Sequence, residues 1–282
     1  MPPVASSKLR LDKLLVDRAL AASRERAAAL ILAGRVLVDE QKVTKPGTPV
    51  APDVGLRLLG QDLRYVSRGG LKLEGALTTW GIDVTGRACA DIGASTGGFT
   101  DCMLQHGAAS VLAVDTGYGQ IAHKLRVDPR VSLMERTNAR TLASGSLRPS
   151  PPGAPSSRPA SPGAKVGSTE SSPAQSSSIT FFAMDVSFIG ASLVLPAVLP
   201  ALAPIDQSWQ GEAVVLVKPQ FEAGREHVGK GGIVRDPAAH RYAVDRVAAT
   251  VRDLGGEVLA TMDSPILGME GNREFLLHAR WP

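Results

Sequence analysis

One glycine-rich turn constrains the fold of this chain more than any other feature. The stretch Asp91-Ile92-Gly93-Ala94-Ser95-Thr96-Gly97-Gly98-Phe99 follows a short apolar run at 88–92 and precedes a segment with helical spacing that ends at Gly107. Glycines in such a turn let the backbone pass close to a ligand, and the start of the helix offers free N–H groups. The sequence therefore predicts a strand, a close-approach turn and a helix in succession.

Strand and helix patterns continue to alternate after this turn. Apolar runs predict further strands at 111–115, 131–134, 179–186 and 213–217. Asp236 and Pro237 predict the start of a helix that ends at Gly255, and residues 257–262 and 274–279 form a final strand pair. Such alternation is typical of an α/β fold with a mostly parallel, doubly wound sheet.

The first 70 residues have a different character. Leu11, Leu14 and Leu15 recur at helical spacing, a second helix is expected over 24–33 with Ser23 as its N-cap, and a short β-hairpin-like unit follows at 35–43. This segment holds 12 Lys and Arg residues against 7 Asp and Glu residues. The surplus indicates either a small polyanion-binding module or an ordinary solvated surface.

Residues 144–178 differ in composition from both parts. They contain 12 Ser, 7 Pro and 4 Gly residues, and Leu147 and Val166 are their sizeable aliphatic side chains. Such a stretch buries too little apolar area to offset the entropy lost on ordering, so we expect a disordered insertion. A domain linker is the alternative, but the flanking strands resemble two halves of one sheet.

Composition excludes several classes of protein. No uncharged apolar run approaches the ~18–20 residues that a membrane span needs, and the N-terminus shows no apolar segment typical of a secretory signal. The two cysteines, Cys89 and Cys102, cannot form a disulfide framework, and the five histidines are scattered without ligand spacing. We therefore expect a cytoplasmic protein with no membrane partner and no metal site.

Two carboxylates near the turn indicate which kind of ligand it could bind. Asp91 lies two residues before the first glycine, and Asp115 ends the next predicted strand, where a carboxylate can accept ribose hydroxyls. The spacing matches neither the dinucleotide fingerprint nor a P-loop. An acid at 91 suits a cofactor with a cationic amino-acid end, such as S-adenosylmethionine. A purely structural turn is the alternative.

Four charged residues far apart in the chain form a second candidate group. Asp185 and Lys218 end predicted parallel strands, where open α/β sheets bind ligands. Lys72 is placed just before an apolar helix, and Glu274 opens the last strand. A lysine behind an apolar strand is costly to bury without a carboxylate partner. A structural salt bridge and a catalytic role both remain open for Asp185 and Lys218.

The motifs described so far, taken together, resemble those of one protein family. Its motifs are Ser67-Arg68-Gly69-Gly70 and the stretches 91–98, 185–189, 218–221, 231–236 and 271–274, with a basic N-terminal stretch that begins at Leu9-Arg10-Leu11-Asp12-Lys13. From about residue 8 onward the chain resembles the TlyA family of ribosomal RNA cytidine-2′-O-methyltransferases, also labelled haemolysin A. The resemblance implies an RNA-binding domain over 8–66. It also implies an FtsJ-like methyltransferase domain over 67–282, with a Rossmann-like, mostly parallel seven-stranded sheet, interrupted only by 144–178.

The resemblance also implies functional residues. A catalytic tetrad around the target ribose would comprise Lys72, Asp185, Lys218 and Glu274. S-adenosylmethionine would be held by Asp91, Gly93, Ala94, Ser95, Thr96, Gly97, Gly98, Phe99, Asp115 and Asn138. RNA phosphates would be contacted by Arg10, Lys13, Arg24, Arg26 and Arg35.

The expected function is methyl transfer from S-adenosylmethionine to a ribose 2′-hydroxyl, with ribosomal RNA or ribosomal subunits as the partner. Lys218 is expected either to accept the hydroxyl proton or to stabilise the forming alkoxide. The alternatives are a membrane-acting haemolysin and a non-catalytic RNA-binding ribosome-assembly factor. The sequence carries no signal for the oligomeric state.

Overall fold

Two compact units make up the chain. A computed structural model describes residues 8–59, 64–148, 178–204 and 206–282. The first unit comprises residues 1–63 and the second comprises residues 64–282. Each unit has its own apolar core.

The N-terminal unit packs two helices against short strands. Its elements are β1 (Leu9–Arg10), α1 (Leu11–Asp17), α2 (Arg24–Leu32), β2 (Val36–Val38), β3 (Gln41–Val43), β4 (Pro49–Val50) and β5 (Leu56–Leu58). Leu11, Leu15 and Ile31 are fully buried between them. The predicted N-cap is confirmed, because the Ser23 hydroxyl accepts a hydrogen bond from the Arg26 N–H at 3.2 Å.

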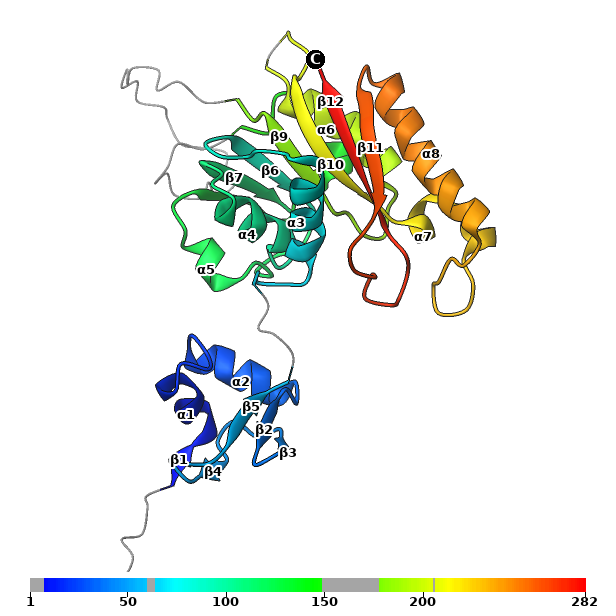
Figure 1. The fold of residues 1–282 in the computed structure, drawn as a ribbon. Coiled ribbons are helices and arrows are strands. Elements are labelled where there is room, and N and C mark those ends of the chain that lie inside the picture. Colours follow the sequence, from blue (N-terminus) through cyan, green and yellow to red (C-terminus); the bar gives the residue numbers. More distant parts are fainter. Residues whose placement is uncertain (1–7, 60–63, 149–177, 205) are drawn as a thin grey trace, which may run out of the picture. The chain divides into compact units, whose positions relative to one another are not determined.

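The second unit alternates helices and strands, as predicted (Figure 1). Its strands are β6 (Ala88–Ile92), β7 (Ser110–Val114), β8 (Val131–Met134), β9 (Phe181–Met184), β10 (Gly211–Val217), β11 (Glu257–Asp263) and β12 (Phe275–Trp281). Its α-helices are α3 (Gly69–Trp80), α4 (Gly98–Gln105), α5 (His123–Arg126), α6 (Ala191–Leu202), α7 (Pro219–Glu222) and α8 (Pro237–Asp253). Two 3₁₀ turns are η1 (Ala139–Thr141) and η2 (Arg225–His227).

All seven strands form one sheet in the order β11-β12-β10-β9-β6-β7-β8. β12 runs antiparallel to its neighbours β10 and β11, and the other neighbouring pairs are parallel. The prediction of a Rossmann-like, mostly parallel seven-stranded sheet is confirmed.

Helices cover both faces of this sheet (Figure 1). One apolar core joins the sheet to α6 and α8 through residues such as Leu195 and Val247. The other joins it to α3 and α4 through residues such as Leu73 and Met103. Because both faces are covered, all five residues of β6 are buried, including the carboxylate of Asp91.

The Ser/Pro-rich stretch begins inside the domain. Most of the predicted insertion, residues 149–177, lies outside the described residues. Its first residues do not behave as predicted, because the Gly145 and Leu147 N–H groups donate to the Pro200 and Ala201 carbonyls, both at 2.9 Å. The Leu147 side chain is 1% exposed. Backbone pairing and a buried leucine therefore fix residues 145–148 against α6.

The expected border at residue 66 also lies too far along the chain. Tyr65 is 2% exposed in the core of the second unit, and the Val66 N–H donates to the Asp101 carboxylate at 2.8 Å. Residues 64–66 thus belong to the second unit, because an aromatic ring and a backbone donor both find their partners there.

Helix α3 starts earlier than the sequence indicated. We predicted Lys72 just before the helix, but the helix begins at Gly69 and Lys72 lies in its first turn. Two successive glycines disfavour a helix start by propensity. Packing nevertheless requires the glycine at 70, since a Cβ there would lie 2.3 Å from the Tyr65 ring.

Candidate active site

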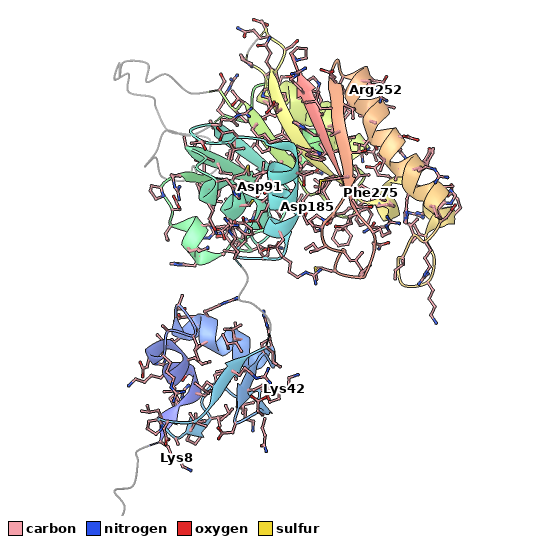
Figure 2. All side chains as sticks on the ribbon, viewed as in Figure 1. Lys8, Lys42, Asp91, Asp185, Arg252 and Phe275 are labelled. Carbon is pink, nitrogen blue, oxygen red and sulfur yellow. The ribbon has the colours of Figure 1, made fainter. Side chains whose placement is uncertain are left out.

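Strand register brings chemically active residues to one edge of the sheet. Met184 pairs with Ile92 on one side and Val215 on the other, and Val217 pairs with Phe275. Asp185 and Lys218 directly follow their strands, whereas Glu274 directly precedes the reversed strand β12. Figure 2 labels Asp91, Asp185 and Phe275, which lie along this edge. The topology therefore gathers residues that are far apart in the chain.

The glycine-rich turn leaves no room for side chains at two positions. Gly93 has φ +89°, and a Cβ there would lie 2.4 Å from the Asp185 carbonyl oxygen. A Cβ at Gly98 would lie 2.4 Å from the Ser67 hydroxyl and 2.9 Å from the Gly70 nitrogen. The turn thus packs closely against both the Asp185 loop and the start of α3, which explains the glycines in both motifs.

Asp91 is a buried carboxylate with one unused oxygen. The side chain is 0% exposed. Its Oδ2 accepts from the Thr100 N–H at 2.8 Å and the Thr100 hydroxyl at 2.6 Å, while Oδ1 has no partner. Burial raises the pKa of Asp91 to about 7, against the opposing effect of the Thr100 hydrogen bonds. A buried oxygen without a donor fits a cationic ligand group.

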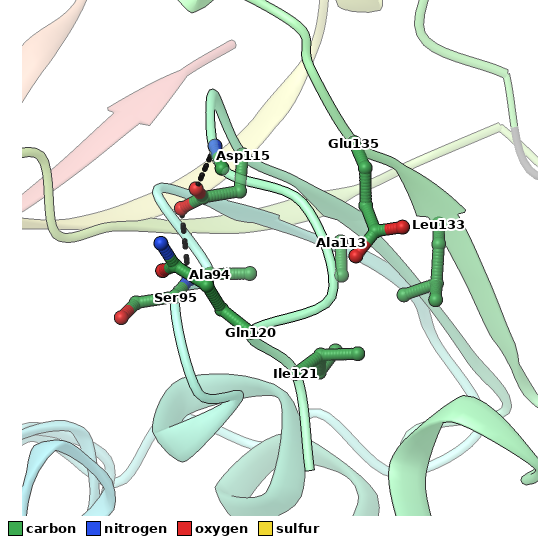
Figure 3. A pocket seen from close by; sticks show the side chains of 9 residues that line it. Ala94, Ser95, Ala113, Asp115, Gln120, Ile121, Leu133 and Glu135 are labelled. Carbon is green, nitrogen blue, oxygen red and sulfur yellow. Dashed lines mark hydrogen bonds between the residues drawn. The ribbon is translucent and has the colours of Figure 1, made fainter. Parts of the chain in front are cut away.

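A pocket lies beside the glycine-rich turn, and residues in and directly after β7 and β8 line it (Figure 3). It is lined by Ala94, Ser95, Ala113, Asp115, Gly117, Gln120, Ile121, Leu133 and Glu135. Asp115 is held by the Ser95 N–H at 2.8 Å and the Gly117 N–H at 2.6 Å. A fixed carboxylate beside an apolar floor can accept hydroxyl groups while a flat ring lies on the apolar side chains.

The predicted cofactor residues divide between this pocket and its surroundings. Ala94, Ser95 and Asp115 line the pocket. Gly97 and Gly98 are buried in packing, Thr96 is exposed, and the Phe99 ring is 3% exposed in the core beside α3. Asn138 is outside the lining, and its side chain caps η1 by accepting from the Arg140 N–H at 3.0 Å.

Sequence reasoning missed part of the pocket. Gly117, Gln120, Ile121, Leu133 and Glu135 were not predicted. Glu135 directly follows β8, so the rule that selected Asp115 at a carboxyl strand end also selects Glu135. The pKa of Glu135 is lowered, chiefly by the hydrogen bond from Arg126.

The first of two lysine–acid pairs joins α3 to β12. Lys72 Nζ lies 2.5 Å from Glu274 Oε2, and the two side chains are 10% and 3% exposed. Such a pair is stable only when both charges are present, because a single buried ion lacks compensation. The pair fixes a helix to the strand that precedes the C-terminus.

The second pair joins the ends of β10 and β9. Lys218 Nζ lies 2.6 Å from Asp185 Oδ1 and donates to the Ser187 hydroxyl at 2.8 Å. Lys218 is 10% exposed at its side chain and Asp185 is 21% exposed. The structure therefore gives each predicted lysine a carboxylate from the predicted set.

The predicted RNA-contacting residues lie in the N-terminal unit. Arg10 and Arg24 both pair with Asp12, at 2.7 Å and 3.2 Å, and the hydrogen bond from Arg10 is the main cause that lowers the pKa of Asp12. Arg35 donates to the Leu59 carbonyl at 2.9 Å. Lys13 is exposed, and Arg26 is half-buried next to the α2 cap. Arg10 and Arg24 are thus partly neutralised by one shared carboxylate.

Family models match both units. The model for FtsJ-like methyltransferases matches residues 65–281, and the model for the S4 domain matches residues 9–54. A solved structure of a hemolysin-named protein from Streptococcus thermophilus is 40% identical, with a TM-score of 0.65. It covers 98% of this chain and 90% of its own. Fold and sequence therefore agree over nearly the whole length.

Curated relatives carry two different names. The 16S/23S rRNA (cytidine-2′-O)-methyltransferase TlyA of Mycobacterium tuberculosis is 41% identical over 97% of this chain and 90% of its own. Hemolysin A of Brachyspira hyodysenteriae is 36% identical over 96% of this chain and 99% of its own. Within the ranges described above, no helix is long and apolar enough to cross a membrane. The chain belongs to the TlyA family of FtsJ-like methyltransferases, with an S4 domain ahead of the methyltransferase fold.

Proposed function

We propose that this protein transfers a methyl group from S-adenosylmethionine to a ribose 2′-hydroxyl of cytidine in ribosomal RNA. The observation that carries the proposal is the meeting of two largely buried lysines, each paired with a carboxylate, with the glycine-rich turn at one edge of the sheet. The relatives named as rRNA methyltransferases support the substrate class.

The residues of the turn fit this cofactor. The unused Oδ1 of Asp91 suits the cationic amino-acid end, and the fixed Asp115 carboxylate suits ribose hydroxyls. Ile121 and Leu133 offer apolar surface to the adenine. When bound, S-adenosylmethionine supplies a methyl group that the positive sulfur has already activated.

The protein must then prepare a poor nucleophile. A ribose hydroxyl has to lose its proton and hold its oxygen in line for attack, so alignment and proton removal are the tasks left to the side chains. Lys218 acts either by accepting the proton or by stabilising the alkoxide while the proton passes to water. Asp185 and Ser187 orient its amine, and the pair of Lys72 with Glu274 lies at the same edge of the sheet.

The ribose 2′-hydroxyl determines which nucleic acid can be the substrate. DNA lacks the 2′-hydroxyl, so the chemistry selects RNA. The N-terminal unit would contact phosphates through Arg10, Lys13, Arg24, Arg26 and Arg35, and the match to the S4 domain model supports this role.

Ribosomal subunits incubated with the protein and labelled S-adenosylmethionine test the proposal. We expect label in 2′-O-methylcytidine of ribosomal RNA, located by mapping modified nucleotides. Absence of label with subunits that lack the modification refutes the proposal. Leakage of liposomes by the pure protein would favour the haemolysin alternative, and failure to bind the methyl donor would favour the assembly-factor alternative.

A further inference from the structure

A buried glutamate outside the tetrad links the two loops that carry Lys218 and Asp185. Glu222 is the last residue of α7, which begins directly after Lys218, and it is 1% exposed. Its Oε2 accepts from the Ser192 hydroxyl at 2.6 Å, and its Oε1 accepts from the Ser192 N–H at 3.2 Å. Ser192 lies in the first turn of α6, which begins six residues after Asp185.

These contacts close a ring. Lys218 binds the Asp185 loop directly, through the 2.6 Å pair with Asp185 and the 2.8 Å hydrogen bond to Ser187. The same loop then enters α6, whose N-terminus is tied back through Glu222 to α7 and thus to Lys218. Lys218 and its carboxylate partner are therefore fixed from both ends.

Glu222 is also held by a residue of α8. Arg246 of α8 donates to the Glu222 carbonyl at 2.9 Å, and its Nε lies 3.7 Å from Oε2. Burial raises the pKa of Glu222, and the hydrogen bonds from Ser192 oppose this effect. The Glu222 carboxylate is rigid because its oxygens contact both Ser192, at the start of α6, and Arg246, and any movement would break these contacts.

We propose that Glu222 is a positioning residue for methyl transfer, which sets the place of the Lys218 amine relative to Asp185 by tying α7 to the start of α6. The inference rests on the proposed function, because Lys218 has to act there on the ribose hydroxyl. Glu222 itself touches neither reactant. Misplacement of a catalytic group by ~1 Å can lower a rate by ~100-fold.

Three variants separate this role from simple stability. Glu222→Ala removes the tie. Glu222→Gln keeps it, because the amide oxygen still accepts from the Ser192 N–H and the hydroxyl can turn to accept from the amide. Val247→Ala is the matched control, since Val247 is fully buried in α8 within the same core but contacts neither loop through a hydrogen bond.

Turnover and affinity are measured on ribosomal subunits. We expect Glu222→Ala to lower kcat by ~10- to 100-fold, with the Kd for S-adenosylmethionine unchanged within about twofold. Glu222→Gln should restore most of kcat, and Val247→Ala should keep kcat despite an equal or larger loss of thermal stability. Equal kcat losses in Glu222→Ala and Val247→Ala at equal stability would overturn the inference.

Lysine labelling tests the same geometry without any RNA. Acylation of the folded protein, read by mass spectrometry, should be several-fold faster at Lys218 in Glu222→Ala than in the parent. Lys72, whose pair with Glu274 lies outside the ring, should be unchanged and serves as the internal reference. Unchanged Lys218 labelling overturns the positioning role even if the parent methylates RNA. Absence of methylation by the parent refutes the proposed function, and labelling then still decides on the role of Glu222.

Discussion

Replacing Asp91 with asparagine should stabilise the ligand-free protein at pH 8 and abolish binding of the methyl donor. Asp91 is fully buried, and one of its oxygens has no hydrogen-bond donor. An ionised carboxylate in that place is unfavourable until a cation arrives. The asparagine removes the charge but also removes the group that attracts the cation.

The pH dependence follows from the folded pKa. Burial raises the pKa of Asp91 from 3.8 to about 7. The stability that Asp91 contributes is therefore fully present below pH ~4, where the carboxyl is neutral in both the folded and the unfolded protein. It falls between pH ~4 and pH 7, because the carboxyl ionises in the unfolded protein but stays neutral in the folded one. It is lost once the pH exceeds 7. Three pKa units correspond to ~4 kcal/mol in total, of which ~3 kcal/mol falls between pH 5 and pH 8.

The asparagine also lowers the free energy of unfolding, but by less than the ionised carboxylate does and by the same amount at every pH. Its oxygen can accept from Thr100, but its NH₂ group occupies the place of the unpartnered Oδ1, at a cost of ~1–3 kcal/mol. At pH 8 the variant should therefore be more stable than the parent by ~1–3 kcal/mol, whereas at pH 5 it should be equal or slightly less stable.

Urea unfolding of both ligand-free proteins at pH 5 and pH 8 measures this difference, and calorimetry measures binding of S-adenosylmethionine. The pH 5 arm is the internal control, because the asparagine penalty is the same at both pH values. If parent and variant differ by the same free energy at pH 5 and pH 8, the buried carboxyl is not the cause and the reasoning fails.

Three further predictions concern the charged residues. Lys218→Ala should lower methyl transfer by ~10²–10⁴-fold with unchanged Kd for S-adenosylmethionine in calorimetry, and a parental rate would disprove its role. Glu274→Gln should destabilise the protein by ~3–5 kcal/mol in urea unfolding, because Lys72 stays buried without its partner; the double variant with Lys72→Met should regain stability but not activity. Lys13→Gln should reduce the slope of log affinity for RNA against log salt by ~0.7–0.9, and an unchanged slope would show that Lys13 contacts no phosphate.

Most strands could be predicted from the sequence, because apolar runs bounded by turns are local signals. The helix α6 could not, since Pro196 and Pro200 lie inside it and proline disfavours a helix interior. Burial of its apolar face between the sheet and α8 outweighs that preference. The start of α3 was misplaced because two successive glycines disfavour a helix by propensity, whereas packing against Tyr65 requires a glycine at position 70.

Site residues that directly follow strand ends could be predicted from the sequence. Contacts between side chains of distant segments could not. The positions of Asp185 and Lys218 follow from the topology of parallel sheets. No local pattern indicated that Glu222 would be buried against Ser192, which lies 30 residues away in the chain. Such contacts form between segments whose distance in the sequence carries no periodic signal.

The reversed direction of β12 has a consequence for how this enzyme family can vary. Because β12 runs against its neighbours, the hairpin that joins it to β11 opens at the reactive edge, and the Ser264 N–H closes this hairpin on the Glu274 carbonyl at 2.8 Å. Lengthening or shortening that connection would displace Glu274 while every parallel strand kept its register. The β11–β12 connection is therefore a segment whose length can change at little cost to the scaffold.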